Sequence, residues 1–212
     1  MSWTHVKALT PIVGIDDGPF EFRTNELVPL IGVVMKGYLH VEGILHQLIH
    51  VDAPVSFVTE AIAKMIVESS HLKQLRAILL NGLTFGGFGV VDLDLLFLKT
   101  QIPAIVVVDR LPDLKRIKKA LLEHFDDGWD RWLLVEKAGS PLSVDLNGRQ
   151  VFLQFRGLPF ETAQVLLQKT TKPQHTQPEA LRLAHMIATS VVSINKIKRE
   201  EELLGKNELK KT

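Results

Sequence analysis

Two short runs of apolar residues constrain the fold of this chain more than any other feature. Ala77–Leu80 and Ala104–Val108 contain no polar residue, and each run stops at a polar side chain, Asn81 or Asp109. Continuous apolar runs of this length are typical of strands that are buried on both faces of a sheet. The sequence therefore predicts two buried strands in the middle of the chain.

Strand and helix patterns alternate around these two runs. A short strand at Ile12–Asp16 precedes two long strands, Leu27–Tyr38 and Leu39–His50, which a turn near Lys36-Gly37 joins as a hairpin. The other predicted strands are Trp132–Glu136, Leu142–Asn147 and Val151–Phe155, and the predicted helices are Val58–Leu72, Val90–Lys99, Pro112–Phe125, Pro159–Lys169 and Pro178–Ile197. A hairpin followed by alternating helices and strands predicts an α/β fold with a mixed sheet and flanking helices.

The order strand, hairpin, helix, strand, helix, strand resembles that of the ribonuclease H-like fold. In that fold, carboxylates at the ends of the first strand and of the strand after the first helix bind metal ions. The corresponding residues of this chain are Asp16 and Asn81. The resemblance therefore directs attention to these two strand ends.

Composition limits the classes of protein that this chain can be. Its 212 residues are 46% hydrophobic, and we predict a single domain over residues 1–195 with a charged tail over 196–212. A formal net charge of +1 excludes nucleic-acid binding through overall charge but leaves a local basic patch open. The absence of cysteine excludes disulfides and thiolate metal sites. The first five residues lack the apolar core of a signal peptide, so a cytoplasmic protein without a membrane span is expected.

Asp16 and Asp17 end the first predicted strand, and Gly18-Pro19 then turns the chain away. Adjacent carboxylates at a strand end are a common way to bind a divalent cation. Aspartates in a tight turn also accept backbone hydrogen bonds, so a turn-capping pair is the alternative. Asn81-Gly82 likewise has two interpretations, a weakened ligand position or a turn that ends the strand.

A glycine-rich loop, Gly86–Gly89, precedes the predicted helix at Val90–Lys99. Gly87 and Gly89 could present backbone N–H groups to a phosphate at the start of this helix, or the loop could pack closely against the sheet. No Lys-Ser/Thr pair follows, so the loop is not a nucleotide-binding P-loop. Asp92 either caps the helix or faces the site.

Basic residues gather on one predicted helix, where Lys115, Lys118 and Lys119 fall on one side. They form either a phosphate-binding surface or an ordinary solvated helix face. The last long helix carries Arg182 and His185, which are further site candidates. A structural or surface role is the alternative for this histidine.

Three parts of the chain resemble endonuclease V, a magnesium-dependent enzyme that cuts nucleic acid near deaminated purines. Val13–Asp16 is similar to its first strand with the metal-binding aspartate, and Ile78–Gly82 followed by Gly87–Val90 is similar to its second acidic strand and the loop beyond. Val151–Ala163 and Gln177–Ala184 are similar to its C-terminal strand and two helices. The resemblance implies Mg²⁺ or Mn²⁺ as a cofactor and nucleic acid as a partner.

A family of mostly archaeal proteins of unknown function, related to endonuclease V, is more similar still. The shared motifs are Gly-Ile-Asp-Asp-Gly-Pro-Phe at 14–20, a glycine-rich block at Gly87–Asp92 and Pro-Glu-x-Leu-Arg-x-Ala-His at Pro178–His185. The resemblance extends from about Val13 to Val191. It implies that Asp16 occupies the position of a metal ligand.

Several residues depart from the endonuclease V pattern. Asn81-Gly82 stands where that enzyme has aspartate-glycine, so a two-metal site loses a charged ligand. Leu83-Thr84-Phe85 lacks the histidine of the corresponding loop, and Arg156-Gly157 replaces a glycine-histidine pair. The glutamate that follows the third strand of the enzyme has no clear counterpart near Asp52.

These departures leave three functions open. The first is a metal-dependent nucleic-acid phosphodiesterase whose altered acidic site contains Asp16, Asp17 and Asn81. The second is a nucleic-acid-binding protein, derived from a nuclease, that no longer cuts. The third is a protein that binds a small ligand or a protein partner in the same acidic pocket.

Overall fold

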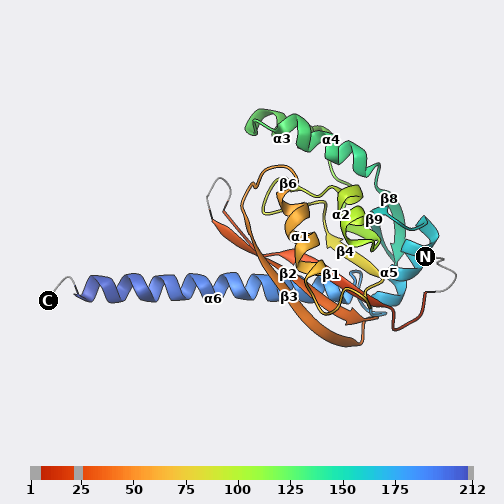
Figure 1. The fold of residues 1–212 in the computed structure, drawn as a ribbon, viewed down its shortest axis with the longest axis horizontal. Helices are drawn as coiled ribbons and strands as arrows, with labels where there is room; N and C mark the ends of the chain where they lie inside the picture. Colours follow the sequence, from red (N-terminus) through yellow and green to blue (C-terminus); the bar gives the residue numbers. More distant parts are fainter. Residues whose placement is uncertain (1–5, 22–25, 210–212) are drawn as a thin grey trace.

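A seven-stranded mixed sheet forms the centre of the molecule (Figure 1). The computed structural model describes residues 6–21 and 26–209. The sheet has the order β3-β2-β1-β4-β7-β9-β8, with β1 (Pro11–Asp17), β2 (Leu27–Lys36), β3 (His40–His50), β4 (Ala77–Asn81), β7 (Ala104–Val108), β8 (Leu142–Leu146) and β9 (Arg149–Arg156). A separate two-stranded ribbon consists of β5 (Thr84–Phe85) and β6 (Gly89–Val90). The prediction of an α/β fold with a mixed sheet is confirmed.

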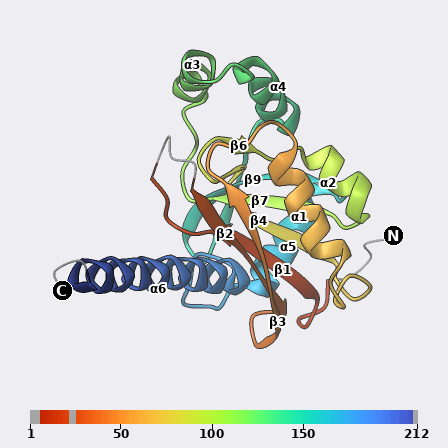
Figure 2. The ribbon, with the colours of Figure 1, turned by 60° about the vertical axis from the view of Figure 1, so that its left-hand side comes forward.

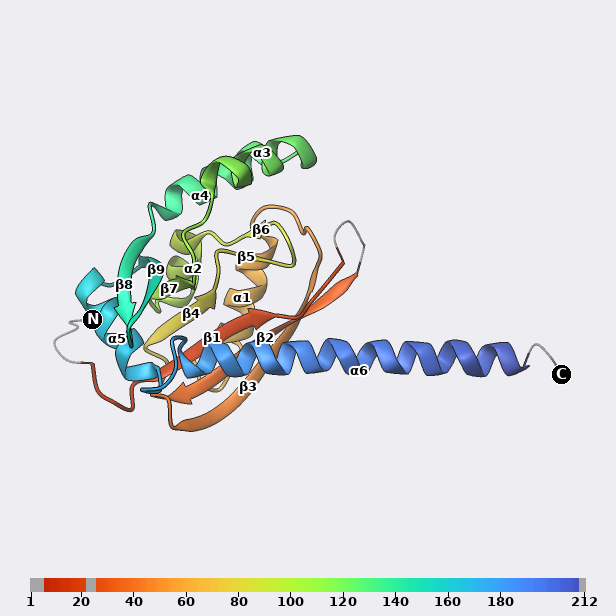
Figure 3. The ribbon, with the colours of Figure 1, turned by 180° about the vertical axis from the view of Figure 1, so that it is seen from behind.

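Helices cover both faces of this sheet (Figure 2). One face packs against α1 (Phe57–Val67) and α2 (Leu93–Thr100), and the other packs against α5 (Phe160–Thr170) and α6 (Glu179–Leu209). The two remaining helices, α3 (Leu114–His124) and α4 (Gly128–Ala138), contact each other and project from the body of the molecule (Figure 3).

Strand alternation divides the side chains of β1 between the two helical layers. Val13 and Ile15 join the core beneath α1 and α2, whereas Ile12 joins the core beneath α5 and α6. Gly14 faces α6, and a Cβ atom at this position would overlap the backbone of Ala180. The missing side chain therefore lets α6 lie directly against β1.

The carboxyl ends of three parallel strands lie on one edge of the sheet. β1 pairs with β4 in parallel, and β4 pairs with β7 in parallel. Ile15 is the register partner of Leu80, so the next residues along the two strands, Asp16 and Asn81, lie side by side. The juxtaposition of these two strand ends was predicted from the order of the elements.

The structure confirms the positions of most predicted elements and corrects others, among them the helix predicted over Val58–Leu72, which ends at Val67 as α1. The segment Trp132–Glu136, predicted as a strand, lies within α4, where Trp132 and Val135 are buried at helical spacing. The helix predicted from Val90 begins at Leu93, because the residues before it form β6 and a helix cap.

The C-terminal helix is longer than the sequence predicts. The predicted tail starts inside α6, which continues to Leu209, and residues 210–212 lie outside the described part of the chain. Of the helices in the described residues, none combines the length and the apolar character that a membrane span requires.

Candidate active site

Asp16, Asn81 and His185 meet at the carboxyl edge of the sheet. Asp16 is the second-last residue of β1 and has 3% of its surface exposed, Asn81 ends β4, and His185 lies on α6. The Asn81 side-chain N–H donates to Asp16 Oδ2 over 2.8 Å. His185 Nδ1 lies 2.8 Å from the same oxygen. Asn81 and His185, both distant from Asp16 in the sequence, therefore contact the same carboxylate oxygen.

The orientation of the Asn81 amide follows from its two neighbours. An ionised carboxylate only accepts hydrogen bonds, so the NH₂ group of Asn81 must face Asp16. The Asn81 carbonyl oxygen then faces Gln177, whose Nε2–H donates to it over 3.3 Å. Gln177 thereby holds Asn81 in the orientation that supports Asp16.

His185 is the accessible member of this cluster. Its side chain is 61% exposed, although Nδ1 contacts the buried carboxylate. The second ring nitrogen, Nε2, is therefore left for solvent or a substrate. A carboxylate that contacts one imidazole nitrogen fixes the ring and stabilises positive charge on it.

Burial raises the pKa of Asp16 above its ordinary value. The hydrogen bonds from Asn81 and His185 act in the opposite direction, because they favour the charged carboxylate. Within the described residues, the only ion-pair partner of Asp16 is His185. The site therefore contains a desolvated carboxylate with little permanent positive charge around it.

Asp17 belongs to the opposite face of the sheet. Its carboxylate accepts a hydrogen bond from the backbone N–H of Gly86, in the glycine-rich loop. Burial, together with the nearby Asp16 charge, raises the pKa of Asp17 to about 6. The structure therefore does not bring the two adjacent aspartates together as one pair of ligands.

The glycine-rich loop is held closely against the sheet. The Phe88 N–H donates to Asp52 Oδ1 over 3.1 Å, and a Cβ atom at Gly87 would overlap that carboxylate. Gly89 pairs with Phe85 in the short ribbon. The N–H groups of Gly86 and Phe88 are thus committed to carboxylates, which favours close packing over phosphate binding.

Asp92 caps α2, as one of its two interpretations predicts. Its carboxylate accepts hydrogen bonds from the backbone N–H groups of Asp94 and Leu95 over 2.9 and 3.1 Å. Lys137 of α4 lies 3.0 Å from Asp92, and Arg156 of β9 pairs with Asp94. These ion pairs join three elements and lie apart from the Asp16 contacts.

Arg182 lies one helical turn before His185 and pairs with a buried glutamate. Its guanidinium contacts Glu179 at 2.6 Å, and Lys172 contacts the same carboxylate at 2.8 Å. The hydrogen bond from Arg182, followed by that from Lys172, holds the pKa of Glu179 at about 2. This ionic cluster fixes the start of α6 beside the site.

The remaining predicted site residues lie elsewhere. Lys115, Lys118 and Lys119 are on α3, which packs against α4, whereas the side chains that contact Asp16 come from β4 and α6. Sequence reasoning missed the roles of Gln177 and Glu179. The sequence held one signal for them: Gln177 immediately precedes the motif Pro178–His185, and Glu179 is the second residue of that motif.

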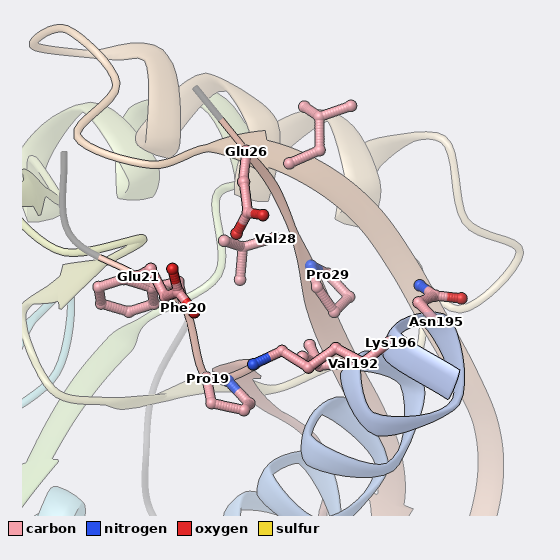
Figure 4. A pocket seen from close by; sticks show the side chains of 10 residues that line it. Pro19, Phe20, Glu21, Glu26, Val28, Pro29, Val192, Asn195 and Lys196 are labelled. Carbon is pink, nitrogen blue, oxygen red and sulfur yellow. The ribbon is translucent and has the colours of Figure 1, made fainter. Parts of the chain in front are cut away.

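A small pocket lies beside the site, between the residues after β1 and the outer part of α6 (Figure 4). Pro19, Pro29 and Val192 supply its apolar lining, and the Lys196 side chain extends toward Pro19. Its volume is about 50 Å³, room for a few water molecules. The pocket is too small to enclose a nucleobase.

The Asp16 cluster fits one divalent cation better than two. Mg²⁺ is commonly held by one or two carboxylates together with water and phosphate oxygens, and Asp16 supplies one such desolvated carboxylate. Across the described residues, no three His, Cys, Asp or Glu side chains converge to hold a metal. Because Asp17 faces away and Asn81 is neutral, a second cation has no carboxylate ligand at this edge.

Solved structures show which class of fold this is. The chain matches a crystal structure of Ciona intestinalis endonuclease V in complex with inosine-containing DNA at a TM-score of 0.56 and 15% identity, over 90% of this chain and 86% of that one. A protein of unknown function from Archaeoglobus fulgidus matches at a TM-score of 0.75 and 29% identity, over 85% and 97%. The protein therefore has the endonuclease V fold.

The chain belongs to the endonuclease dU family. The model of that family matches residues 9–192. A relative from Methanothermobacter thermautotrophicus, named only as a UPF0215 protein, is 41% identical over 191 residues, which cover 90% of this chain and 91% of the relative. The predicted membership of an archaeal-type family related to endonuclease V is confirmed.

Proposed function

We propose that this protein is an endonuclease that hydrolyses phosphodiester bonds in DNA containing deoxyuridine. The observation that supports it most is the carboxylate of Asp16 with His185 Nδ1 at 2.8 Å, on the strand edge of an endonuclease V fold. The family name supplies the substrate class, and the Ciona intestinalis neighbour was solved with DNA.

His185 is the residue that moves a proton in this proposal. Asp16 stabilises an imidazolium through Nδ1, and Nε2–H then points to the open side of the site. From there it can protonate the oxygen that leaves phosphorus as water adds. General acid catalysis of this kind contributes about 10²–10⁴-fold in rate.

Asn81 and Gln177 position the carboxylate. The amide N–H of Asn81 holds Asp16 Oδ2, and Gln177 prevents the amide from turning. Asp16 would hold one Mg²⁺ or Mn²⁺ together with phosphate oxygens of the DNA, and the ion would supply an activated water and charge neutralisation.

The test is cleavage of an end-labelled DNA duplex that contains one deoxyuridine, with Mg²⁺ or Mn²⁺. We expect the wild-type protein to cut the labelled strand and His185→Gln to be at least about 100-fold slower. His40→Gln, an exposed histidine on β3, is the matched control and should retain the wild-type rate. Equal rates for both variants would exclude His185 from the reaction.

A second function is favoured by one specific observation. Asn81 stands where endonuclease V has an acidic ligand, and it donates a hydrogen bond to Asp16. The same arrangement is expected of a site that no longer binds a metal ion. The protein would then bind nucleic acid without cutting it. Salt-sensitive DNA binding without cleavage, unchanged in Asp16→Asn, would support this alternative over the endonuclease.

A further inference from the structure

Helices α3 and α4 form an arm that shares little core with the rest of the molecule. Figures 1 and 3 show the arm projecting from the body on the side away from α6. Leu121 is the only fully buried residue of α3. A buried cluster of Val90, Leu121, Trp132 and Val135 closes the base of the arm. Apart from the side that packs on α4 and this cluster, the α3 surface is exposed.

The arm begins at the same sheet edge as the Asp16 cluster. α3 follows β7, which is parallel to β4 and ends at the edge where Asn81 lies. In α4, Arg131 donates to the backbone oxygens of Phe88 and Asp52 over 2.6 and 3.1 Å. Phe88 belongs to the glycine-rich loop that Asp17 also holds. The anchor of the arm is therefore linked to the residue next to Asp16.

One stripe of this arm combines positive charge with exposed apolar surface. Lys115, Lys118, Lys119 and Leu122 recur at helical spacing, and Leu122 is 45% exposed. Trp129 of α4 is 54% exposed, and the Lys118 ammonium lies 5.3 Å from the centre of its ring. Along α3, four lysine and arginine side chains outnumber one acidic side chain, Glu123, which lies 3.8 Å from Lys119.

We propose that this stripe binds the phosphate backbone of the DNA that the Asp16 site cuts. The proposal rests on the proposed function, because it takes the same DNA as its ligand. Lys115, Lys118 and Lys119 match the charge of successive phosphates, and Trp129 packs against a sugar or base between them. The arm would hold one part of the duplex while the Asp16 site, at the same carboxyl edge of the sheet, meets the phosphodiester bond.

Charge complementarity is the reason for choosing DNA as the occupant of the stripe. A partner protein that covered Leu122 and Trp129 would also have to neutralise Lys115 and Lys118, and would meet Lys119 already 3.8 Å from Glu123. A phosphate backbone does so at regular spacing and releases its own counterions. The two occupants are distinguished by how binding depends on salt.

The main experiment measures DNA affinity against salt concentration. The full-length chain with Asp16→Asn is titrated onto a fluorescent deoxyuridine duplex in EDTA, so cutting does not interfere. Lys115→Gln with Lys119→Gln should make the slope of log affinity against log salt shallower by about 2, at about 0.9 per phosphate contact. Affinity at about 0.1 M salt should then fall by about 10- to 60-fold.

Two further variants sharpen the result. Lys64→Gln with Lys73→Gln removes the same charge from exposed lysines of α1 and of the turn before β4, and should leave the slope unchanged. Trp129→Ala should weaken binding at least about fivefold with little change in slope, because it removes packing and not charge. Thermal melting checks that each variant remains folded.

The outcomes separate this proposal from the proposed function. If the Lys115 and Lys119 variant keeps the wild-type slope, or if the control variant changes it equally, the arm does not bind DNA. If the protein binds no DNA at any salt concentration, the proposal is also overturned. A lysine-dependent slope in a protein that never cuts would retain the arm and reject the endonuclease.

Discussion

Asn81 sets the charge of the carboxyl edge beside Asp16. Its side chain lies beside Asp16 and donates a hydrogen bond to that carboxylate. A carboxylate at position 81 would instead offer a second ligand for a metal ion. The side-chain oxygen of Asn81 is occupied by Gln177. The neutral amide therefore stabilises a single carboxylate and keeps the charge of the site low.

Replacing Asn81 with aspartate should increase the affinity for divalent cations. Two carboxylates at neighbouring strand ends would repel each other until a cation lies between them. We expect Asn81→Asp to bind Mn²⁺ at least about tenfold more tightly than the wild-type protein in a calorimetric titration. Asn147→Asp, in the exposed turn between β8 and β9, is the control. Unchanged Mn²⁺ affinity would mean that Asn81 does not adjoin a cation site.

The strand period alone could have separated Asp16 from Asp17. Successive side chains of a strand point to opposite faces, so two adjacent aspartates cannot both face α6. The predicted position of Asp16 beside Asn81 is confirmed, whereas its role as a site residue stays a prediction. His185 contacts Asp16 across 169 residues of sequence, and Gln177 contacts Asn81 across 96 residues. Contacts between such distant residues could not be predicted from the sequence.

At the scale of elements, the contact between β1 and α6 depends on one glycine. A methyl group at Gly14 would meet the Ala180 backbone, which cannot move without displacing the helix. We expect Gly14→Ala to destabilise the protein by about 2–3 kcal/mol and to lower Tm by about 5–10 °C. Gly43→Ala is the control, since its methyl would meet only the end of the His71 ring. Equal losses in thermal melting would contradict this account.

The contact between Asp17 and the glycine-rich loop predicts a dependence on pH. Folding raises the pKa of Asp17 to about 6, so its contribution to stability is complete below about pH 4 and is lost as pH rises through 6. Asp17→Asn retains an acceptor for the Gly86 N–H without the buried charge. The variant should equal the wild-type protein near pH 4 and be more stable by about 1–3 kcal/mol at pH 7.

Denaturant unfolding in EDTA at the two pH values measures this effect. Asp126→Asn, at an exposed aspartate before α4, should show the same stability difference from the wild-type protein at both pH values. A loss of stability in Asp17→Asn at pH 7 would mean that the ionised carboxylate is the form that the fold requires.

The one predicted strand that became a helix shows what local patterns leave out. Trp132–Glu136 contains a continuous apolar run, which fits either a short strand or one buried turn of a helix. Arg131, which pairs with Asp127 and reaches two loop carbonyls, is satisfied only when α4 packs on the glycine-rich loop. Tertiary contacts of this kind are absent from any local window.

On the scale of the whole molecule, the chain is a sheet with an acidic edge between two projecting parts. α6 continues well past the sheet on one side, and the α3–α4 arm projects on the other (Figure 3). The order of strands and helices was sufficient to predict the sheet and the edge at which Asp16 and Asn81 meet. The directions of the two projections could not be predicted, because solvated helices carry no core pattern that fixes their direction.

In the function that we propose for this protein, Asp16 is the catalytic carboxylate of a DNA endonuclease that recognises deoxyuridine. Its most direct test is single-turnover cleavage, with excess protein and Mg²⁺ or Mn²⁺, of two duplexes that differ only in one deoxyuridine or thymidine. We predict that the wild-type protein cuts the deoxyuridine duplex at least about 100-fold faster and that Asp16→Asn loses at least about 100-fold of that rate. Equal cutting of both duplexes, cutting that survives in Asp16→Asn, or no cutting with either ion would contradict the claim.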